Sequence, residues 1–254
     1  MVARALSFGV VAEAYERFRP GYPVELLDLV MAYAGGPVRT ALEIGAGTGK
    51  ATRLFARGGI AVTATEPDAA MLAELRKHVP ANVTTVQAAF EDLPLDSSYE
   101  LVYSAAALHW TKPQGRWARM AALVRPGGVF ASFGVPIQLA DPDLKEAVRA
   151  ARSPYLEDDG VPSPDGAAPV DRPMEWPGTE LQEAEGFTDV RQAVIERRLT
   201  VSAHDYVGYL STVSAYVMLA PADREQVFRR IIEVLPETVE LDAEITAHLA
   251  RRHQ

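Results

Sequence analysis

The chain has 254 residues, 48% of them hydrophobic, and a formal net charge of −9 at pH 7. This balance favours one large α/β domain, or a core domain with a cap. It argues against a nucleic-acid partner, because no run of lysines and arginines offers an electrostatic footprint. The lack of cysteine excludes disulfides, thiolate nucleophiles and zinc sites with cysteine ligands.

The N-terminal stretch contains no convincing signal peptide, because Arg4 and Glu13 interrupt its apolar pattern. No apolar run approaches the roughly 18–20 residues that span a bilayer. We therefore expect a cytoplasmic protein without a membrane partner, as a monomer or homodimer. Two helices are predicted here, separated by the turn Arg19–Pro23 and ended by Gly35–Pro37.

A glycine-rich turn follows the first predicted strand, residues 41–44, and leads into a helix predicted over 50–57. Gly45, Gly47 and Gly49 allow positive φ and close approach of the backbone, and the helix start offers N–H groups to a ligand. The G-x-G-x-x-G pattern of dinucleotide folds fails at Lys50, and the phosphate-loop pattern fails at its first and last positions. The turn predicts a site for a small, nucleoside-like ligand; an ordinary glycine-rich turn is the alternative.

The pattern E-x-G-x-G-x-G, from Glu43 to Gly49, resembles the first motif of the Rossmann-like (class I) S-adenosylmethionine (SAM) methyltransferases. The resemblance implies an α/β fold with a doubly wound, mostly parallel seven-stranded sheet. Its last strand is antiparallel, and a helical cap is inserted after strands five and six. SAM is then the cofactor, S-adenosyl-L-homocysteine (SAH) the product and a small molecule the acceptor. The five histidines show no zinc-site spacing, so we expect no metal.

A second strand, residues 60–65, ends at Glu66, and Pro67 starts a helix whose apolar stripe includes Met71. A carboxylate at this distance after the glycines suits ribose, because it can accept hydrogen bonds from both vicinal hydroxyls. A plain acidic residue at a helix N-terminus is the alternative.

After a third strand, residues 83–87, the stretch Ala88–Leu95 resembles the adenine-binding segment G-D-A-E-x-L-P-F of the family. Ala89 stands where the family has Asp, so a side-chain acceptor for the adenine amino group is missing. The resemblance leaves the backbone at Phe90 and the neighbouring Glu91 to read the base. The alternative is a plain turn.

The fourth strand, residues 99–104, leads through Ser104 to His109 and Trp110. In the resembled family this strand exit faces the sulfonium methyl. Methyl transfer is an in-line displacement that needs mainly proximity and orientation, so no catalytic triad is required. His109 is the candidate catalytic base for an acceptor that must lose a proton, or it only shapes the pocket.

The segment Tyr15–Pro23 resembles the Y-x-x-x-R-P-x-Y-P leader of a branch that includes aconitate-type and secondary-metabolite methyltransferases. This resemblance implies a lid whose Tyr15 and Arg19 approach the methionine end of the cofactor. Surface packing of a proline-rich turn is the alternative.

In the rest of the chain, segments of the core are predicted to alternate with segments of the cap. Arg125–Gly128 resembles the family's turn before strand five, and a proline-rich stretch containing Trp176 resembles the variable substrate cap. Strand six is predicted over 190–201. Helices are predicted over 203–219 and from Pro221, followed by an alternating last strand over 239–249 that places His248 outside.

The predicted domain organisation has six segments: lid helices 1–36, a SAM-binding core 37–135, a cap insertion 136–178, a core helix and strand six 179–202, a helical cap 203–236, and the last strand 237–254. The expected cofactor-binding residues are Tyr15, Arg19, Glu43, Gly45, Ala46, Gly47, Gly49, Glu66, Pro67, Met71, Ala89, Phe90, Glu91 and Ser104. The expected acceptor-binding residues are Tyr22, His109, Trp110, Trp176, Tyr206 and Tyr209.

The resulting hypothesis is a SAM-dependent methyltransferase that acts on a small molecule, such as a secondary metabolite. Two alternatives stay open: a SAM-binding enzyme that does not methylate, such as a cyclase, and a ligand-binding module with a vestigial site. The sequence leaves open the acceptor and the choice among O-, N- and C-methylation.

Overall fold

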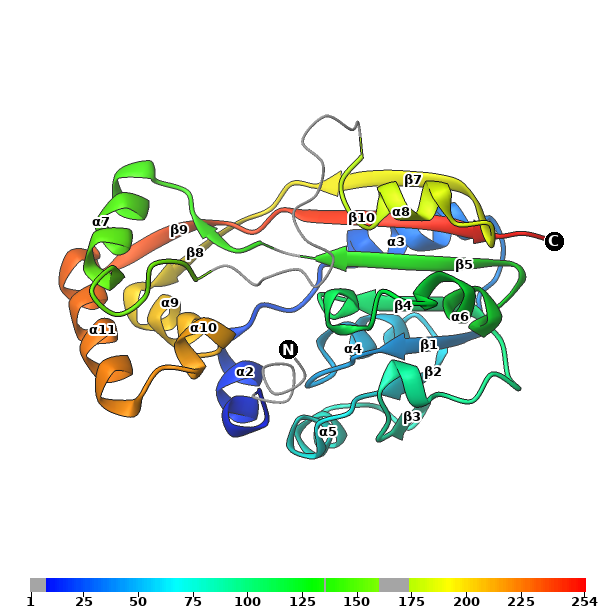
Figure 1. The fold of residues 1–254 in the computed structure, drawn as a ribbon, viewed down its shortest axis with the longest axis horizontal. Coiled ribbons are helices and arrows are strands. Elements are labelled where there is room, and N and C mark those ends of the chain that lie inside the picture. The colour runs from blue at the N-terminus through cyan, green and yellow to red at the C-terminus, as the bar shows by residue number, and fades with distance from the viewer. Residues whose placement is uncertain (1–7, 135, 160–173) are drawn as a thin grey trace. The chain divides into compact units, whose positions relative to one another are not determined.

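The computed structural model describes residues 8–134, 136–159 and 174–254 (Figure 1). The chain divides into two compact units. The sheet unit comprises Gly21–Gly134, Ser163–Ile195 and Thr246–Gln254, and the helical unit comprises Met1–Pro20, Val135–Pro162 and Glu196–Ile245. No helix among the described residues is both long and apolar enough for a membrane crossing.

The sheet unit is built on seven strands in the order β3-β2-β1-β4-β5-β10-β7. Strands β1 to β5 pair in parallel, and β10 runs antiparallel to β5. The predicted mostly parallel seven-stranded sheet with an antiparallel last strand is confirmed. The strands are β1 (Thr40–Ile44), β2 (Ala61–Thr65), β3 (Val83–Val86), β4 (Tyr99–Ala105), β5 (Val124–Gly134), β7 (Phe187–Ile195) and β10 (Ile245–Arg252).

Helices cover both faces of this sheet, as its buried strands require. On one face Phe55 of α4 stacks on Tyr103 of β4, with ring centroids 4.3 Å apart. On the other, Trp117 of α6 packs edge-on against Phe130 of β5, with centroids 5.8 Å apart. The helices and short 3₁₀ turns of this unit are α3 (Val24–Ala34), α4 (Lys50–Arg57), α5 (Ala69–Arg76), η2 (Phe90–Asp92), η3 (Leu108–Trp110), α6 (Arg116–Leu123) and α8 (Gly178–Glu183).

The helical unit contains a three-stranded antiparallel sheet in the order β6-β9-β8, which the sequence did not predict. Two of its helices start at side-chain caps: the Asp141 carboxylate accepts two N–H groups at the start of α7, and the Ser202 hydroxyl accepts the Asp205 N–H at the start of α9. The elements are η1 (Phe8–Val11), α2 (Ala12–Phe18), β6 (Gln138–Leu139), α7 (Pro142–Arg152), β8 (Arg198–Ser202), α9 (Ala203–Leu210), α10 (Ser214–Val217), α11 (Pro221–Val234) and β9 (Thr238–Asp242).

Two predicted strands were wrong as single elements. The strand expected over 190–201 is β7 and β8, and the strand expected over 239–249 is β9 and β10; each pair is divided between two sheets. The Ala243 N–H donates to the Arg197 carbonyl at the point where the two segments, β7–β8 and β9–β10, pass from one sheet to the other. The alternation of side chains continues through this crossing, so a period of two cannot reveal that the partner strand changes.

His248 was also misplaced, because it was expected on an outer face and is only 3% exposed. β10 lies inside the sheet, between β5 and β7, and α8 covers it. A Cβ added at Gly178 of α8 would lie 2.6 Å from His248 Cδ2. The His248 Nε2 lies 2.9 Å from Gln192 Oε1, and burial lowers the pKa of the imidazole to about 4.

Candidate active site

The glycine turn between β1 and α4 needs its glycines. Gly45, Gly47 and Gly49 have φ values of +67°, +57° and +85°, which only glycine adopts at little cost. A Cβ on Gly45 would lie 2.5 Å from the Ala107 Cβ, so the turn also packs tightly against the segment after β4. Among the described residues, a Cβ on Gly47 would meet only the Met71 Cε, at 3.5 Å. The turn is therefore closed at Gly45 and more open at Gly47.

Glu66 follows β2 and ties the turn to the start of α5. Its Oε2 accepts the Gly47 N–H at 2.8 Å, and its Oε1 accepts the Asp68 N–H at 2.9 Å. The side chain is 7% exposed, and burial raises the pKa of this carboxyl. Each carboxylate oxygen has a second lone pair, so the group can still accept ligand hydroxyls.

Glu43 of β1 is fully buried beneath α4. Its Oε2 accepts the hydroxyls of Thr52, at 2.5 Å, and Tyr103, at 3.0 Å. Burial raises the pKa of Glu43 to about 8, against the lowering effect of those two hydrogen bonds. The nearby Glu66 raises this pKa further, and Arg53 lowers it.

Two buried oxygens beside the glycine turn have no hydrogen-bond partner among the described residues: Glu43 Oε1 and Thr48 Oγ1. Buried polar atoms in native proteins normally have partners. The pair therefore indicates that a polar or cationic ligand group, or water, completes this end of the sheet.

The segment expected to bind adenine, around Phe90 and Glu91, makes hydrogen bonds to other parts of the sheet unit. Phe90 is buried in the sheet core, and its carbonyl accepts the Arg119 Nε–H at 2.8 Å. The Glu91 Oε1 accepts the backbone N–H of Lys112 at 2.6 Å. One oxygen of each residue is thus already engaged within the protein, and their contact with a base stays a prediction, as it does for the neighbouring Ala89.

The segment that follows β4 carries His109, the candidate catalytic base. The Ser104 hydroxyl is buried and donates to the Ile44 carbonyl at 3.3 Å, so it links β4 to β1. His109 and Trp110 lie on η3, with ring centroids 4.7 Å apart. Both side chains are partly exposed. The structure therefore brings η3, the glycine turn and Glu66 together within the sheet unit, at the carboxyl ends of the parallel strands.

The leader residues lie in two different units. The Arg19 Nε donates to the Thr212 Oγ1 at 2.8 Å, and its guanidinium lies 5.0 Å from the Tyr15 ring centre and 4.7 Å from that of Tyr209. Tyr22 belongs to the sheet unit, where its ring centroid lies 5.2 Å from that of Phe133. The contact of Tyr15 and Arg19 with a cofactor stays a prediction.

The aromatic residues expected to line an acceptor pocket are mostly core. Tyr206 and Tyr209 are buried in the apolar core of the helical unit, with ring centroids 6.3 Å apart. Trp176 was assigned to the cap, but it packs against the core of the sheet unit, and the Arg116 guanidinium lies 5.5 Å from its ring centre. An acceptor role for the three rings stays a prediction.

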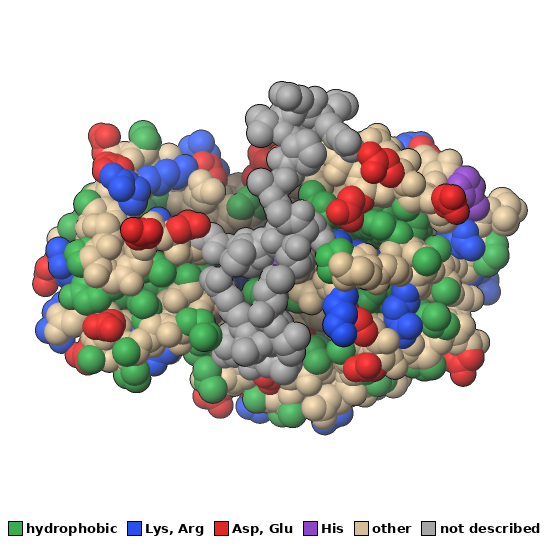
Figure 2. Space-filling model, in the orientation of Figure 1, with side chains coloured by type: hydrophobic (Ala, Val, Ile, Leu, Met, Phe, Trp, Pro, Cys, Tyr) green, Lys and Arg blue, Asp and Glu red, His purple; other side chains and the backbone are tan. Residues whose placement is uncertain are grey.

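Sequence reasoning missed the partners of Glu43 and the network around Arg116 and Thr111. Tyr103 could have been found, because neighbouring parallel strands place it on the same face as Glu43. Among the described residues, no group of three or more His, Asp or Glu side chains could hold a metal ion. Described acidic and basic side chains are interspersed on the face drawn in Figure 2.

The region around the glycine turn matches a known protein family. Residues 42–132 match the family described as a methyltransferase domain. An uncharacterized methyltransferase of Mycobacterium tuberculosis is 41% identical over 125 residues, which cover 49% of this chain and 50% of that protein. A probable S-adenosylmethionine-dependent methyltransferase of Saccharomyces cerevisiae is 30% identical over 141 residues, covering 53% of this chain and 48% of that protein. The chain thus spans about half the length of these curated relatives.

Among solved structures, a "putative type II methyltransferase" from Anaeromyxobacter dehalogenans matches with a TM-score of 0.61 and 23% identity. The match covers 93% of this chain and 98% of that one. At this identity the likeness shows a shared fold. The comparisons therefore support a methyltransferase domain, with its sequence match over residues 42–132.

Proposed function

We propose that this protein transfers a methyl group from SAM to a small-molecule acceptor. The observation that carries the proposal is the arrangement of the glycine turn, between β1 and α4, beside Glu66 at the end of β2. Three glycines with positive φ bring backbone to the carboxyl end of the sheet, and the Glu66 carboxylate accepts the N–H of the middle glycine, Gly47. A ligand with a ribose fits there, because open backbone and a carboxylate with spare lone pairs lie side by side.

The orphaned oxygens support SAM over an uncharged nucleoside. When bound, SAM supplies an electrophilic methyl group on a sulfonium, next to an amino acid end that carries an ammonium. Glu43 Oε1 and Thr48 Oγ1 are buried oxygens without partners among the described residues. A cationic group beside Glu43 would favour the ionised carboxylate, in which Oε1 is an acceptor. In this proposal Glu66 holds the ribose hydroxyls, and the backbone of the glycine turn faces the amino acid end.

The remaining predicted cofactor contacts belong to the same proposal. They extend it along the carboxyl ends of β2 to β4 and onto the leader: Ala46, Pro67, Met71, Ala89, Phe90, the backbone of Glu91, Ser104, Tyr15 and Arg19. The leader resembles that of the aconitate-type and secondary-metabolite branch, which makes a secondary metabolite the acceptor class to test first.

His109 is the proposed general base. It lies on η3 directly after β4, and an imidazole there can take the proton of a hydroxyl or acidic carbon. Trp110, on the same turn, and Tyr22 are proposed to contact the acceptor. Tyr206, Tyr209 and Trp176 complete this proposal, although each also serves as core.

Calorimetric titration of SAM and of SAH into the full chain tests the cofactor proposal. One site per chain is expected for each ligand. Glu66→Gln should weaken both ligands, because an amide carries no charge and offers fewer acceptor lone pairs to ribose. Glu233→Gln, on the exposed face of α11, is the control and should bind as the wild type does. Absence of binding at millimolar SAM would contradict the proposal and favour a vestigial site.

A further inference from the structure

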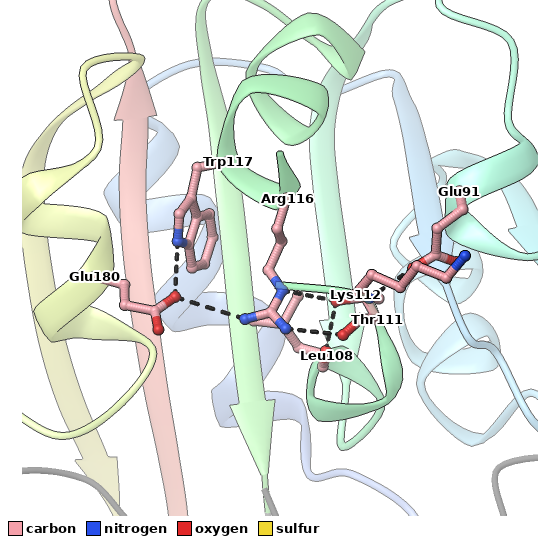
Figure 3. A network of polar contacts seen from close by, with 7 residues as sticks. All are labelled: Glu91, Leu108, Thr111, Lys112, Arg116, Trp117 and Glu180. Carbon is pink, nitrogen blue, oxygen red and sulfur yellow. Dashed lines mark hydrogen bonds and ion pairs between the residues drawn. The ribbon is translucent and has the colours of Figure 1, made fainter. Parts of the chain in front are cut away.

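A buried arginine lies behind the turn that carries His109. Arg116, in the first turn of α6, is 1% exposed (Figure 3). Its Nε donates to the Thr111 Oγ1 and a terminal nitrogen donates to the Thr111 carbonyl, both at 2.8 Å. Another terminal nitrogen lies 3.5 Å from Glu180 Oε2, which also accepts the Trp117 Nε1–H at 2.8 Å.

Thr111 links Arg116 to η3. Its hydroxyl donates to the Leu108 carbonyl at 2.7 Å while it accepts from Arg116. The backbone closes the same turn, because the Trp110 N–H donates to the Ala107 carbonyl and the Thr111 N–H to the Leu108 carbonyl. His109 therefore lies inside a closed loop whose end is held by the guanidinium.

The turn is held on its other side by the segment proposed to bind adenine. The Lys112 N–H donates to Glu91 Oε1 at 2.6 Å, and Glu91 belongs to η2 (Figure 3). Arg119, one turn after Arg116 on α6, donates to the Phe90 carbonyl of η2 at 2.8 Å. One helix thus anchors both η2 and η3, and Glu91 joins the two directly.

Packing alone gives little reason for this arrangement. Burying a guanidinium costs free energy unless every donor is paired, and an apolar side chain of the same volume often stabilises a fold as well or better. What the charged group adds is direction, since its planar fork fixes two hydrogen bonds to one residue. That residue is Thr111, two positions after His109.

We propose that Arg116, Thr111 and Glu91 are positioning residues that clamp the His109 turn against η2. Binding of the adenine end of the cofactor at η2 then also stabilises the His109 turn, where the acceptor reacts. This inference rests on the proposed function, because it gives η2 the adenine and His109 the acceptor. In this arrangement the side chain of Glu91 links the two halves of the site instead of reading the base.

Amide hydrogen exchange of the full chain, followed by NMR with and without SAH, tests the clamp. Thr111→Val removes the hydroxyl but keeps the shape, and Thr111→Ser keeps the hydroxyl. In the ligand-free protein we expect the amides of Trp110, Thr111 and Lys112 to exchange at least about tenfold faster in Thr111→Val than in Thr111→Ser. The amides of β4 should be unchanged in both variants. Equal exchange at the turn in the two variants would overturn the clamp.

The second pair tests the link to η2. Glu91→Ala removes the acceptor of the Lys112 N–H, and Glu91→Gln keeps one. In the wild type and in Glu91→Gln, SAH should slow exchange both at η2 and at residues 108–112. In Glu91→Ala, SAH should slow exchange at η2 only. Protection of residues 108–112 by SAH in Glu91→Ala would overturn the link. If SAH does not bind the wild type, the proposed function fails, and the Thr111 pair still decides the clamp.

Discussion

Glu43 gives the stability of the sheet unit an unusual dependence on pH. Burial raises its pKa to about 8 in the folded protein, from the value of 4.5 that is usual for an exposed glutamate. Between these values the folded state keeps the proton and the unfolded state releases it. Stability from this group is therefore full below pH 4.5 and is lost as the pH rises through about 8.

The size of the effect follows from one proton. When the native state binds one proton more than the unfolded state, the free energy of unfolding falls by about 1.4 kcal/mol per pH unit. From pH 5.5 to pH 7.5 the wild type should lose about 2–3 kcal/mol more than Glu43→Gln, whose amide is neutral throughout. Contributions from other groups, such as His248, are common to both proteins and cancel in the difference.

Urea unfolding at pH 5.5, 6.5 and 7.5 measures this difference. Trp110, Trp117 and Trp176 all lie in the sheet unit, so tryptophan fluorescence reports on the unit that contains Glu43. Glu233→Gln is the control and should keep the wild-type dependence on pH. Parallel curves of unfolding free energy against pH for the wild type and Glu43→Gln would contradict this prediction, because Glu43 would then be ionised in the folded protein.

Three further predictions concern the glycine turn and the proposed site. Gly45→Ala should lower the free energy of unfolding by about 2–4 kcal/mol, because it forces a Cβ at positive φ against Ala107. Gly36→Ala is the control, since its Cβ would meet no described atom within 4 Å. Glu66→Ala should raise the dissociation constant of SAH by about 10- to 100-fold in calorimetry, and an unchanged value would remove Glu66 from the site. His109→Gln should lower turnover by roughly 10²- to 10⁴-fold while SAH binding is kept; a loss below about fivefold would reject the base role.

The sheet and the glycine turn could be predicted because their signals are local. β1 and β2 are short apolar runs followed at once by Gly45 and by Glu66, and both features lie where the sequence places them. The fold then follows from parallel pairing, which requires the helices that connect the strands.

What the sequence could not reveal depends on contacts far along the chain. The crossing at Arg197 and Ala243 preserves the alternation of side chains, so nothing in the pattern marks it. Glu91 was expected to lie beside the base, but its Oε1 accepts the backbone N–H of Lys112, which is 21 residues away. Arg116 reads as an exposed charge at a helix start. Its burial depends on Glu180 and Thr111, which no local rule joins to it.

Methyl transfer from SAM can be tested by following both of its products in one reaction. The full chain is incubated with methyl-labelled SAM and a small-molecule extract, and both SAH and labelled small molecules are quantified by mass spectrometry. We expect SAH in amounts equal to the labelled product, with both reduced in Glu66→Ala and unchanged in Glu233→Gln. SAM that is bound without formation of SAH or a labelled product would contradict methyl transfer and indicate a SAM-binding protein of another class.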